Sequence, residues 1–239
     1  MIMKKGQVAL FVIISIIIIA GIFIFLSVQK PVSVEQPSIK PISSYIEECI
    51  KSTGEDALIF VGQQGGFYEL PKNSIDSYPY YFYNNKSYLP SKETVEKQIS
   101  LYINEMLPFC TKNFVDFPDF YTESRAVDTE TVILENKVRF NVAYPVIAKK
   151  GGTIYSLEEF SAEIPSRLDV IYSAAESMIS AQVENPASIC LSCMINIGIA
   201  NDIYIDMENY GDDAVLFTIT DKNIMIKGLP YEFTFANQY

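Results

Sequence analysis

Residues 8–28 (VALFVIISIIIIAGIFIFLSV) contain no charged side chain. As an α-helix rising about 1.5 Å per residue, this run spans roughly 30 Å, the thickness of the hydrocarbon core of a bilayer. Ile, Val and Phe would occupy every face of that helix, which argues against a half-buried helix of a globular core. The run is longer than the apolar part of a secretory signal, and no A-x-A-like cleavage site follows it. The sequence therefore predicts one transmembrane helix.

The charges around this run predict the orientation of the chain. Lys4 and Lys5 precede it, and only Lys30 follows it closely. Basic residues beside a transmembrane helix are retained on the cytoplasmic side. We therefore expect residues 1–7 to be a cytoplasmic or signal segment. The C-terminal domain then lies outside, on a single-pass protein of the cell membrane.

The composition of the remaining chain argues against several classes of function. The first 30 residues contain no acid, so all 29 acidic residues follow them, and histidine is absent. A strongly acidic surface repels phosphate backbones, which makes nucleic acid an unsuitable partner. Without histidine the commonest general base and metal ligand is missing. We expect a protein that is not an enzyme, with no cofactor and no metal site; a surface hydrolase with paired carboxylates is a remote alternative.

Three prolines mark residues 29–43 as a semi-extended linker. The spacing of apolar residues in 44–239 then predicts an extracytoplasmic α+β domain with about three helices and antiparallel sheet. Ser44 and Glu47 form a capping box at the start of the first helix, and Gly65-Gly66 ends it. The other helices are expected at 91–109 and at 166–184, the latter with Ser166 as N-cap. Strands are expected at 80–83, 87–89, 137–148, 153–163, 194–208, 214–220, 223–226 and 231–236.

The four cysteines all lie on the expected outer side of the membrane, where disulfides persist. Of the three possible pairings we favour Cys49–Cys110 between the first two helices, with Cys190–Cys193 closing a small loop. A redox role for the second pair would require it at the start of a helix. Residues 194–197 favour a strand instead, so we expect a structural disulfide. A four-cysteine zinc site is a weaker alternative, because only one CxxC pair exists.

Three further patterns are candidates for surface sites. Tyrosines at 78, 80, 81, 83 and 88 surround the first hairpin, where we favour packing on the sheet over a binding surface. Asn85 begins an N-x-S sequence at the expected hairpin tip and is a candidate glycosylation site. The acids at 202, 206, 208, 212 and 213 do not match the spacing of a calcium loop, so we expect a solvated acidic face.

The residues at the start of the apolar run carry a more specific signal. Lys4-Lys5-Gly6-Gln7 resembles the class III signal of archaeal type IV pilins and archaellins. The resemblance implies that a peptidase cuts between Gly6 and Gln7, and that the hydrophobic helix stays on the mature protein and packs into a filament core. Many members of that family carry Glu five residues after the cut, where this chain has Phe11.

The resemblance extends beyond the signal. Residues 45–51 (YIEECIK), 62–67 (GQQGGF) and 228–237 (GLPYEFTFAN) are similar to uncharacterised membrane-anchored proteins of small-genome archaea, which also begin with a KKGQ-type anchor. That similarity covers nearly the whole chain and implies an archaeal cell-surface setting without an established activity.

These observations together predict a non-enzymatic cell-surface protein. The first hypothesis is a pilin-like structural subunit that associates with copies of itself through its N-terminal helix, in a filament or envelope assembly. The alternative is a single-pass anchored adhesion or binding module that does not polymerise. In both, the expected partners are membrane lipid and other surface proteins.

Overall fold

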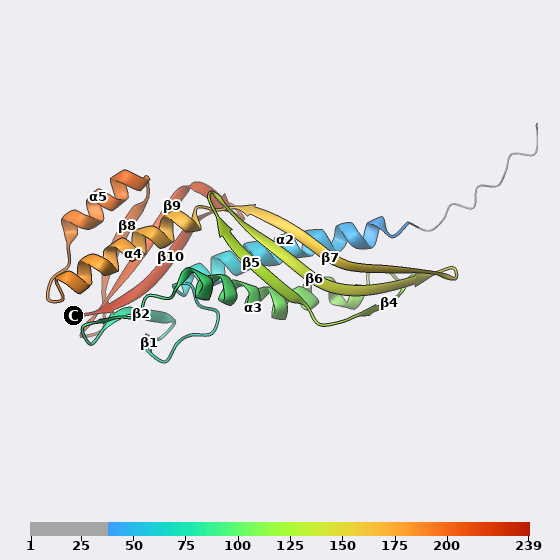
Figure 1. Ribbon diagram of the computed structural model, residues 1–239, viewed down its shortest axis with the longest axis horizontal. Coiled ribbons are helices and arrows are strands. Elements are labelled where there is room, and N and C mark those ends of the chain that lie inside the picture. Colours follow the sequence, from blue (N-terminus) through green and yellow to red (C-terminus); the bar gives the residue numbers. More distant parts are fainter. Residues whose placement is uncertain (1–37) are drawn as a thin grey trace, which may run out of the picture. The chain divides into compact units, whose positions relative to one another are not determined.

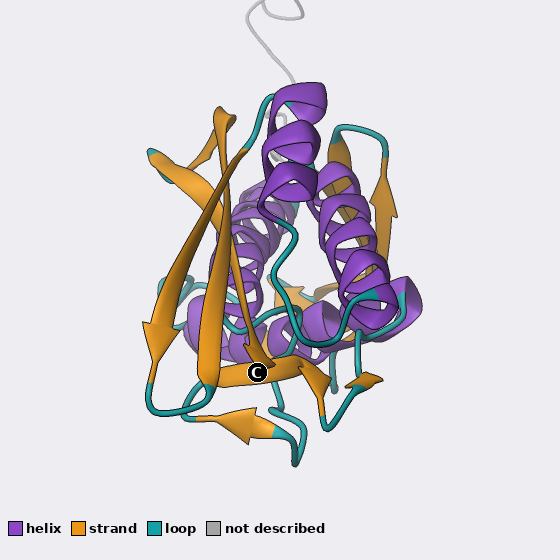
Figure 2. Ribbon diagram, turned by 90° about the vertical axis from the view of Figure 1, so that its left-hand side faces the viewer, coloured by secondary structure: helices purple, strands orange, loops and turns teal. Residues whose placement is uncertain are grey.

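Four helices and two β-sheets make up the part of the chain that the computed structural model describes, residues 38–239 (Figures 1 and 2). The α+β class is confirmed, with four helices where about three are predicted. The expected membrane helix at 8–28 and the Gly6–Gln7 bond lie outside the described residues. Within residues 38–239, no helix has both the length and the apolar character needed to span a bilayer.

The first sheet has the strand order β1-β2-β10-β9-β8, and β3 pairs with β2. Its C-terminal strands β8, β9 and β10 form an antiparallel meander, whereas β10 pairs with β2 in parallel. The sheet is therefore mixed rather than purely antiparallel as predicted. Period-two patterns report which residues share a face but not the relative direction of two strands far apart in the chain. The strand bounds are β1 Ser74–Ile75, β2 Tyr78–Tyr83, β3 Lys86–Ser87, β8 Tyr204–Tyr210, β9 Ala214–Ile226 and β10 Leu229–Gln238.

The second sheet is antiparallel and centres on β6. β5 pairs with the first half of β6 and β4 with its second half, while β7 pairs along its other edge. Gly151 and Gly152, both at positive φ, close the β6–β7 hairpin, which the sequence pattern predicts. The bounds are β4 Tyr121–Ser124, β5 Asp128–Leu134, β6 Lys137–Lys150 and β7 Thr153–Pro165.

Three of the helices are those that the sequence predicts, with shifted starts. α2 (Lys40–Gln63) begins four residues before Ser44, because Pro41 fits the first helical turn, where no intrahelical N–H is needed. α3 (Lys92–Thr111) follows Ser91, whose side chain accepts a hydrogen bond from the Thr94 N–H as an N-cap. For α4 (Leu168–Glu184) the N-cap is Arg167 rather than Ser166.

The fourth helix, α5 (Leu191–Asn201), occupies residues for which a strand is predicted. Isoleucines at 195, 197 and 199 alternate with small or polar residues, which favours a strand by period alone. The helix forms because Cys190 caps its start, and it ends at Asp202, which adopts the left-handed conformation (φ 52°). The strand begins only at Tyr204.

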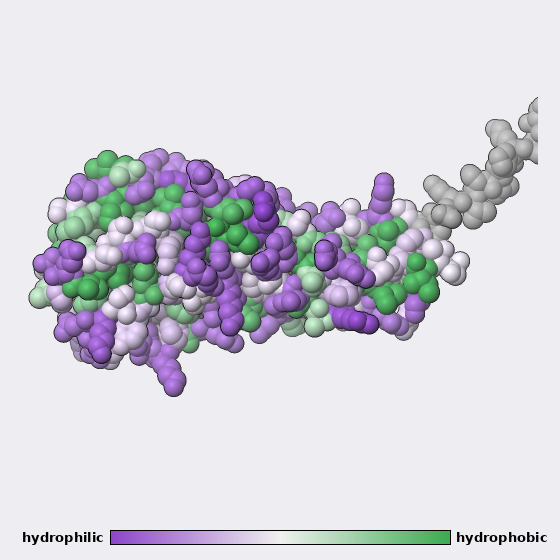
Figure 3. Space-filling view, in the orientation of Figure 1, coloured by the Kyte–Doolittle hydropathy of each residue, from purple (hydrophilic) through white to green (hydrophobic). Residues whose placement is uncertain are grey.

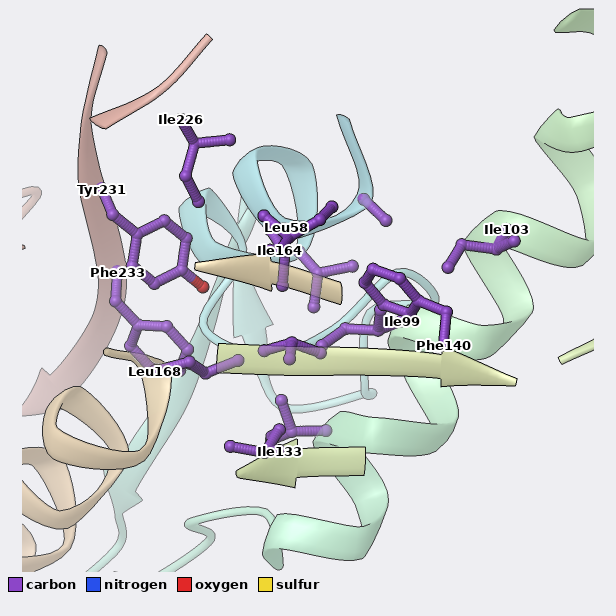
Figure 4. Close-up of a cluster of buried hydrophobic side chains, with 14 of the residues drawn as sticks. Leu58, Ile99, Ile103, Ile133, Phe140, Ile164, Leu168, Ile226, Tyr231 and Phe233 are labelled. Atoms are coloured by element: carbon purple, nitrogen blue, oxygen red, sulfur yellow. The ribbon is translucent and has the colours of Figure 1, made fainter. Parts of the chain in front are cut away.

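The core lies where α2 packs against both sheets (Figure 4). A Cβ atom added at Gly54 would lie 2.6 Å from Phe140 Cε2, on the second sheet. A Cβ atom added at Gly62 would lie 2.6 Å from the carbonyl oxygen of Glu232, on the first. Both contacts are shorter than real Cβ atoms allow, so glycine sets the distance between α2 and each sheet.

We expect Gly62→Ala to destabilise the protein by about 1–3 kcal/mol, because the backbone of β10 cannot move away as a side chain could. This cost outweighs the roughly 1 kcal/mol that alanine gains over glycine within a helix. Chemical denaturation of the full-length protein, followed by circular dichroism, measures the change. Lys51→Ala, at an exposed position of α2, is the control; equal stability of both variants would contradict the close approach.

Candidate functional site

Helix α5 is mostly exposed although it contains no charged residue (LSCMINIGIAN). Met194 is its only buried residue. Leu191, Ile195 and Ile199 are 52%, 61% and 78% exposed. Their spacing of four residues places them on one side of the helix. An apolar stripe of this kind on an exposed helix marks an interaction site rather than a core face.

Strand β8 continues this apolar area beside the helix. It is an edge strand of the first sheet, and its Met207, which shares the sheet face of the core residue Phe217, is 47% exposed. Tyr204, on the opposite sheet face, is 54% exposed. An open groove of about 640 Å³ lies between α5 and β8. We call the four side chains at 191, 195, 199 and 207 the α5–β8 surface. Figure 3 shows hydrophobic residues at several places on this face of residues 38–239, some of them at the end where α5 lies.

Acidic residues border the α5–β8 surface. Asp202 and Asp206 are among the residues that line the groove, Asp202 at the end of α5 and Asp206 on the sheet face that Tyr204 shares. The Lys222 ammonium lies 3.9 Å from the centre of the Tyr204 ring, as a cation–π contact. The surface is thus an apolar strip with an acidic border on one side.

A buried ion pair holds the C-terminal end of α5. The Arg167 guanidinium donates to Asp221 Oδ1 on β9 at 3.1 Å and to the carbonyl oxygen of Asn201, the last residue of α5. Asp221 is fully buried, and the backbone N–H of Asn223 also donates to its Oδ1. Arg167 therefore connects the start of α4, the end of α5 and the first sheet.

The N-terminal end of α5 carries the Cys190–Cys193 disulfide. Cys190 is the N-cap, and its Sγ accepts a hydrogen bond from the Cys193 N–H at 3.3 Å. The predicted pairing is confirmed, but its setting differs from the prediction because a helix follows the pair. The strand expected from residue 194 had argued against a redox role.

The other predicted disulfide, Cys49–Cys110, is also confirmed and joins α2 to α3. Its sequence separation of 61 residues corresponds to about 4 kcal/mol of stabilisation through the unfolded state. The Tyr45 hydroxyl donates to the Cys110 carbonyl oxygen at 2.8 Å beside it. The Cys49–Cys110 disulfide therefore holds α2 and α3 together.

The tyrosines around the first hairpin mainly pack, as favoured from the sequence. Tyr81 is fully buried, stacks on Phe235 at 4.3 Å between ring centres and donates to the Gly65 carbonyl oxygen. Burial raises the pKa of the Tyr81 hydroxyl well above its usual value. Tyr80 is buried too, and Tyr88 is 41% exposed.

The remaining predicted sites do not come together into a reactive centre. Asn85 is exposed in the turn between β2 and β3, at φ 57°, and its glycosylation stays a prediction. Within residues 38–239 no three acidic or cysteine side chains are grouped to hold a metal ion, and this applies to the acids between 202 and 213. Gly6 and Gln7 lie outside the described residues.

Comparisons of this chain with protein-family models, with curated proteins and with solved structures found no match. The α5–β8 surface is therefore a candidate site on the basis of its geometry alone.

We expect Arg167→Met to destabilise the protein by about 3–5 kcal/mol, because the buried carboxylate of Asp221 would lose its ionic partner. Chemical denaturation of the full-length protein measures the loss. The matched control is Arg139→Met, which removes an exposed pair with Glu163 and should cost less than about 1 kcal/mol. Equal losses in the two variants would show that Asp221 does not depend on Arg167.

Proposed function

We propose that this chain is a non-enzymatic, pilin-like structural subunit of an archaeal surface filament or envelope assembly. The hydrophobic helix at 8–28 anchors it in the cell membrane, and the domain lies outside. The observation that supports this proposal best is the α5–β8 surface, an exposed apolar area on an acidic domain. Two disulfides fit an oxidising location outside the cytoplasm.

The proposed occupant of the α5–β8 surface is a second copy of this chain. An eleven-residue helix and a seven-residue strand fall short of the roughly 800 Å² per partner that a stable interface buries. The isolated domain is therefore a monomer in this proposal. Copies held side by side by their N-terminal helices have a high effective concentration, which makes a weak contact sufficient.

The N-terminal helix supplies the main driving force of assembly in this proposal. Inside a bilayer, lipid tails are as apolar as isoleucine, so helices gain little by associating. In a filament drawn out of the membrane, the same helix would face water unless it packed against its copies. The branched residues at 16–19 pack well in such a core.

The acidic border favours a second candidate, the anchored binding module that does not polymerise. Asp202 and Asp206 of two copies would repel each other across a self-contact, whereas a basic partner would pair with them. In that case an apolar segment flanked by lysine or arginine occupies the groove.

We expect Ile17→Lys to abolish polymers of the full-length protein in detergent-free buffer, because the charge of the lysine would be buried without a partner among the packed N-terminal helices of the filament. Ile199→Asp should weaken or disorder them, since it places a charge on the α5–β8 surface. Electron microscopy and sedimentation measure both effects. The control is Ile154→Asp, an exposed isoleucine on β7; the proposal fails if the unaltered protein stays a single bitopic monomer in lipid.

A photo-reactive amino acid at position 199 should cross-link one copy to another on intact cells, because the residue is 78% exposed and belongs to the proposed contact. Mass spectrometry of the adduct identifies the partner. An adduct with a different, basic protein would support the binding module instead. The same probe at position 154 is the control, and equal, unspecific labelling at both positions would contradict any docking on α5.

A further inference from the structure

We propose that Cys190 and Cys193 form a redox-active pair that exchanges electrons with cysteine pairs of other polypeptides. This inference does not depend on the filament proposal. Both cysteines are half-buried. Leu191, which lies between them in the sequence and is the first residue of the α5 stripe, is 52% exposed. The pair therefore lies at an accessible end of its helix.

The first argument is the size of the closed loop. Cys190–Cys193 has a sequence separation of 3, against 61 for Cys49–Cys110. A short loop removes little conformational freedom from the unfolded chain, so the bond adds little to stability. The fold therefore tolerates reduction of Cys190–Cys193 better than reduction of Cys49–Cys110, as a pair that is reduced and reoxidised in the folded protein requires.

The second argument is the setting of Cys190 at the N-terminus of an eleven-residue helix. Its Sγ accepts the Cys193 N–H at 3.3 Å and lies 3.6 Å from the Ser192 hydroxyl oxygen. After reduction, a thiolate on Cys190 has these two donors and the positive end of the helix dipole beside it. Cys190 is therefore the nucleophile of the pair, and a good leaving group when it is released from a mixed disulfide.

The third argument is an unsatisfied acceptor behind the disulfide. A small cavity of about 20 Å³ is lined by both cysteines and by Asn237 of β10. Asn237 is 2% exposed, and its side-chain oxygen Oδ1 has no hydrogen-bond donor. A disulfide has no S–H to offer, whereas a protonated thiol does. Reduction therefore supplies a donor in a cavity that holds a buried acceptor, which stabilises the dithiol form.

The exchange proceeds in two balanced steps. A thiolate of a peptide dithiol attacks Cys190 Sγ, forming a mixed disulfide, and the electron pair of the broken S–S bond leaves on Cys193, which takes a proton. The second peptide thiolate then attacks the peptide sulfur of the mixed disulfide and releases the Cys190 thiolate. The peptide dithiol loses two electrons and becomes a disulfide, while the Cys190–Cys193 pair gains them.

Equilibration of the full-length protein with glutathione buffers of graded ratio tests the proposal without altering the chain. After acid quenching and alkylation, mass spectrometry gives the reduced fraction of each disulfide. We expect Cys190–Cys193 to be reduced at glutathione ratios at least about tenfold milder than Cys49–Cys110 requires, because its dithiol form gains hydrogen bonds at Cys190 and at Asn237. Equal resistance of the two bonds would overturn the redox role and leave Cys190–Cys193 as a structural bond.

Two pairs of variants test the mechanism. Asn237→Leu should shift the glutathione equilibrium toward the disulfide by about fivefold or more, because the dithiol loses its acceptor. Thr129→Val also removes a buried oxygen that has no hydrogen-bond partner, but one far from the pair in sequence, and it should not shift the equilibrium. With Cys193→Ser, the remaining Cys190 should form a mixed disulfide with a peptide disulfide about tenfold faster at about pH 6 than Cys193 does in Cys190→Ser. Equal rates would overturn the assignment of Cys190 as nucleophile.

Discussion

The close approach of α2 to both sheets fixes the position of the other elements. Gly54 allows the helix to touch Phe140 of β6, and Gly62 allows it to touch the backbone of β10. From β10, pairing extends to β9 and then to β8, the edge strand of the candidate surface. The Cys49–Cys110 bond then holds α3 on α2. A side chain at either glycine would separate α2 from a sheet, and the strands beyond would shift with it.

Helix α5 can expose apolar residues because its two ends are held independently. At the start, the Cys190–Cys193 bond and the Cys190 cap fix the first turn. At the end, Arg167 binds both Asn201 and the buried Asp221. A buried ion pair adds little net stability, but it specifies one arrangement, because an unpaired buried charge is costly. With the ends fixed, the central stripe does not need to pack for α5 to keep its place.

The sequence predicted the elements whose signals are local. Two adjacent glycines end α2 and another two close the β6–β7 hairpin, and both disulfides form as paired. The caps predicted at Ser44 and Ser166 were wrong, because α2 starts earlier and α4 is capped by Arg167. The parallel pairing of β2 with β10 could not be predicted from the sequence, because it joins segments far apart in the chain. The apolar face of α5 was missed as well. The sequence contained a signal for this face, because residues 191–201 carry no charge and apolar residues recur every four positions. The alternation of isoleucines over the same residues favoured a strand instead.

Both functional proposals depend on whether residues 195–199 form a helix or a strand. In a strand, the isoleucines at 195, 197 and 199 would share one face. In the helix, Ile195 and Ile199 line up with Leu191 toward solvent, while Ile197 packs against the core. The same turn of backbone places the Cys193 N–H at Cys190 Sγ, where it stabilises a thiolate, as a strand would not. The sequence argument against redox chemistry relied on a strand after the cysteine pair. With a helix there, the same reasoning favours it.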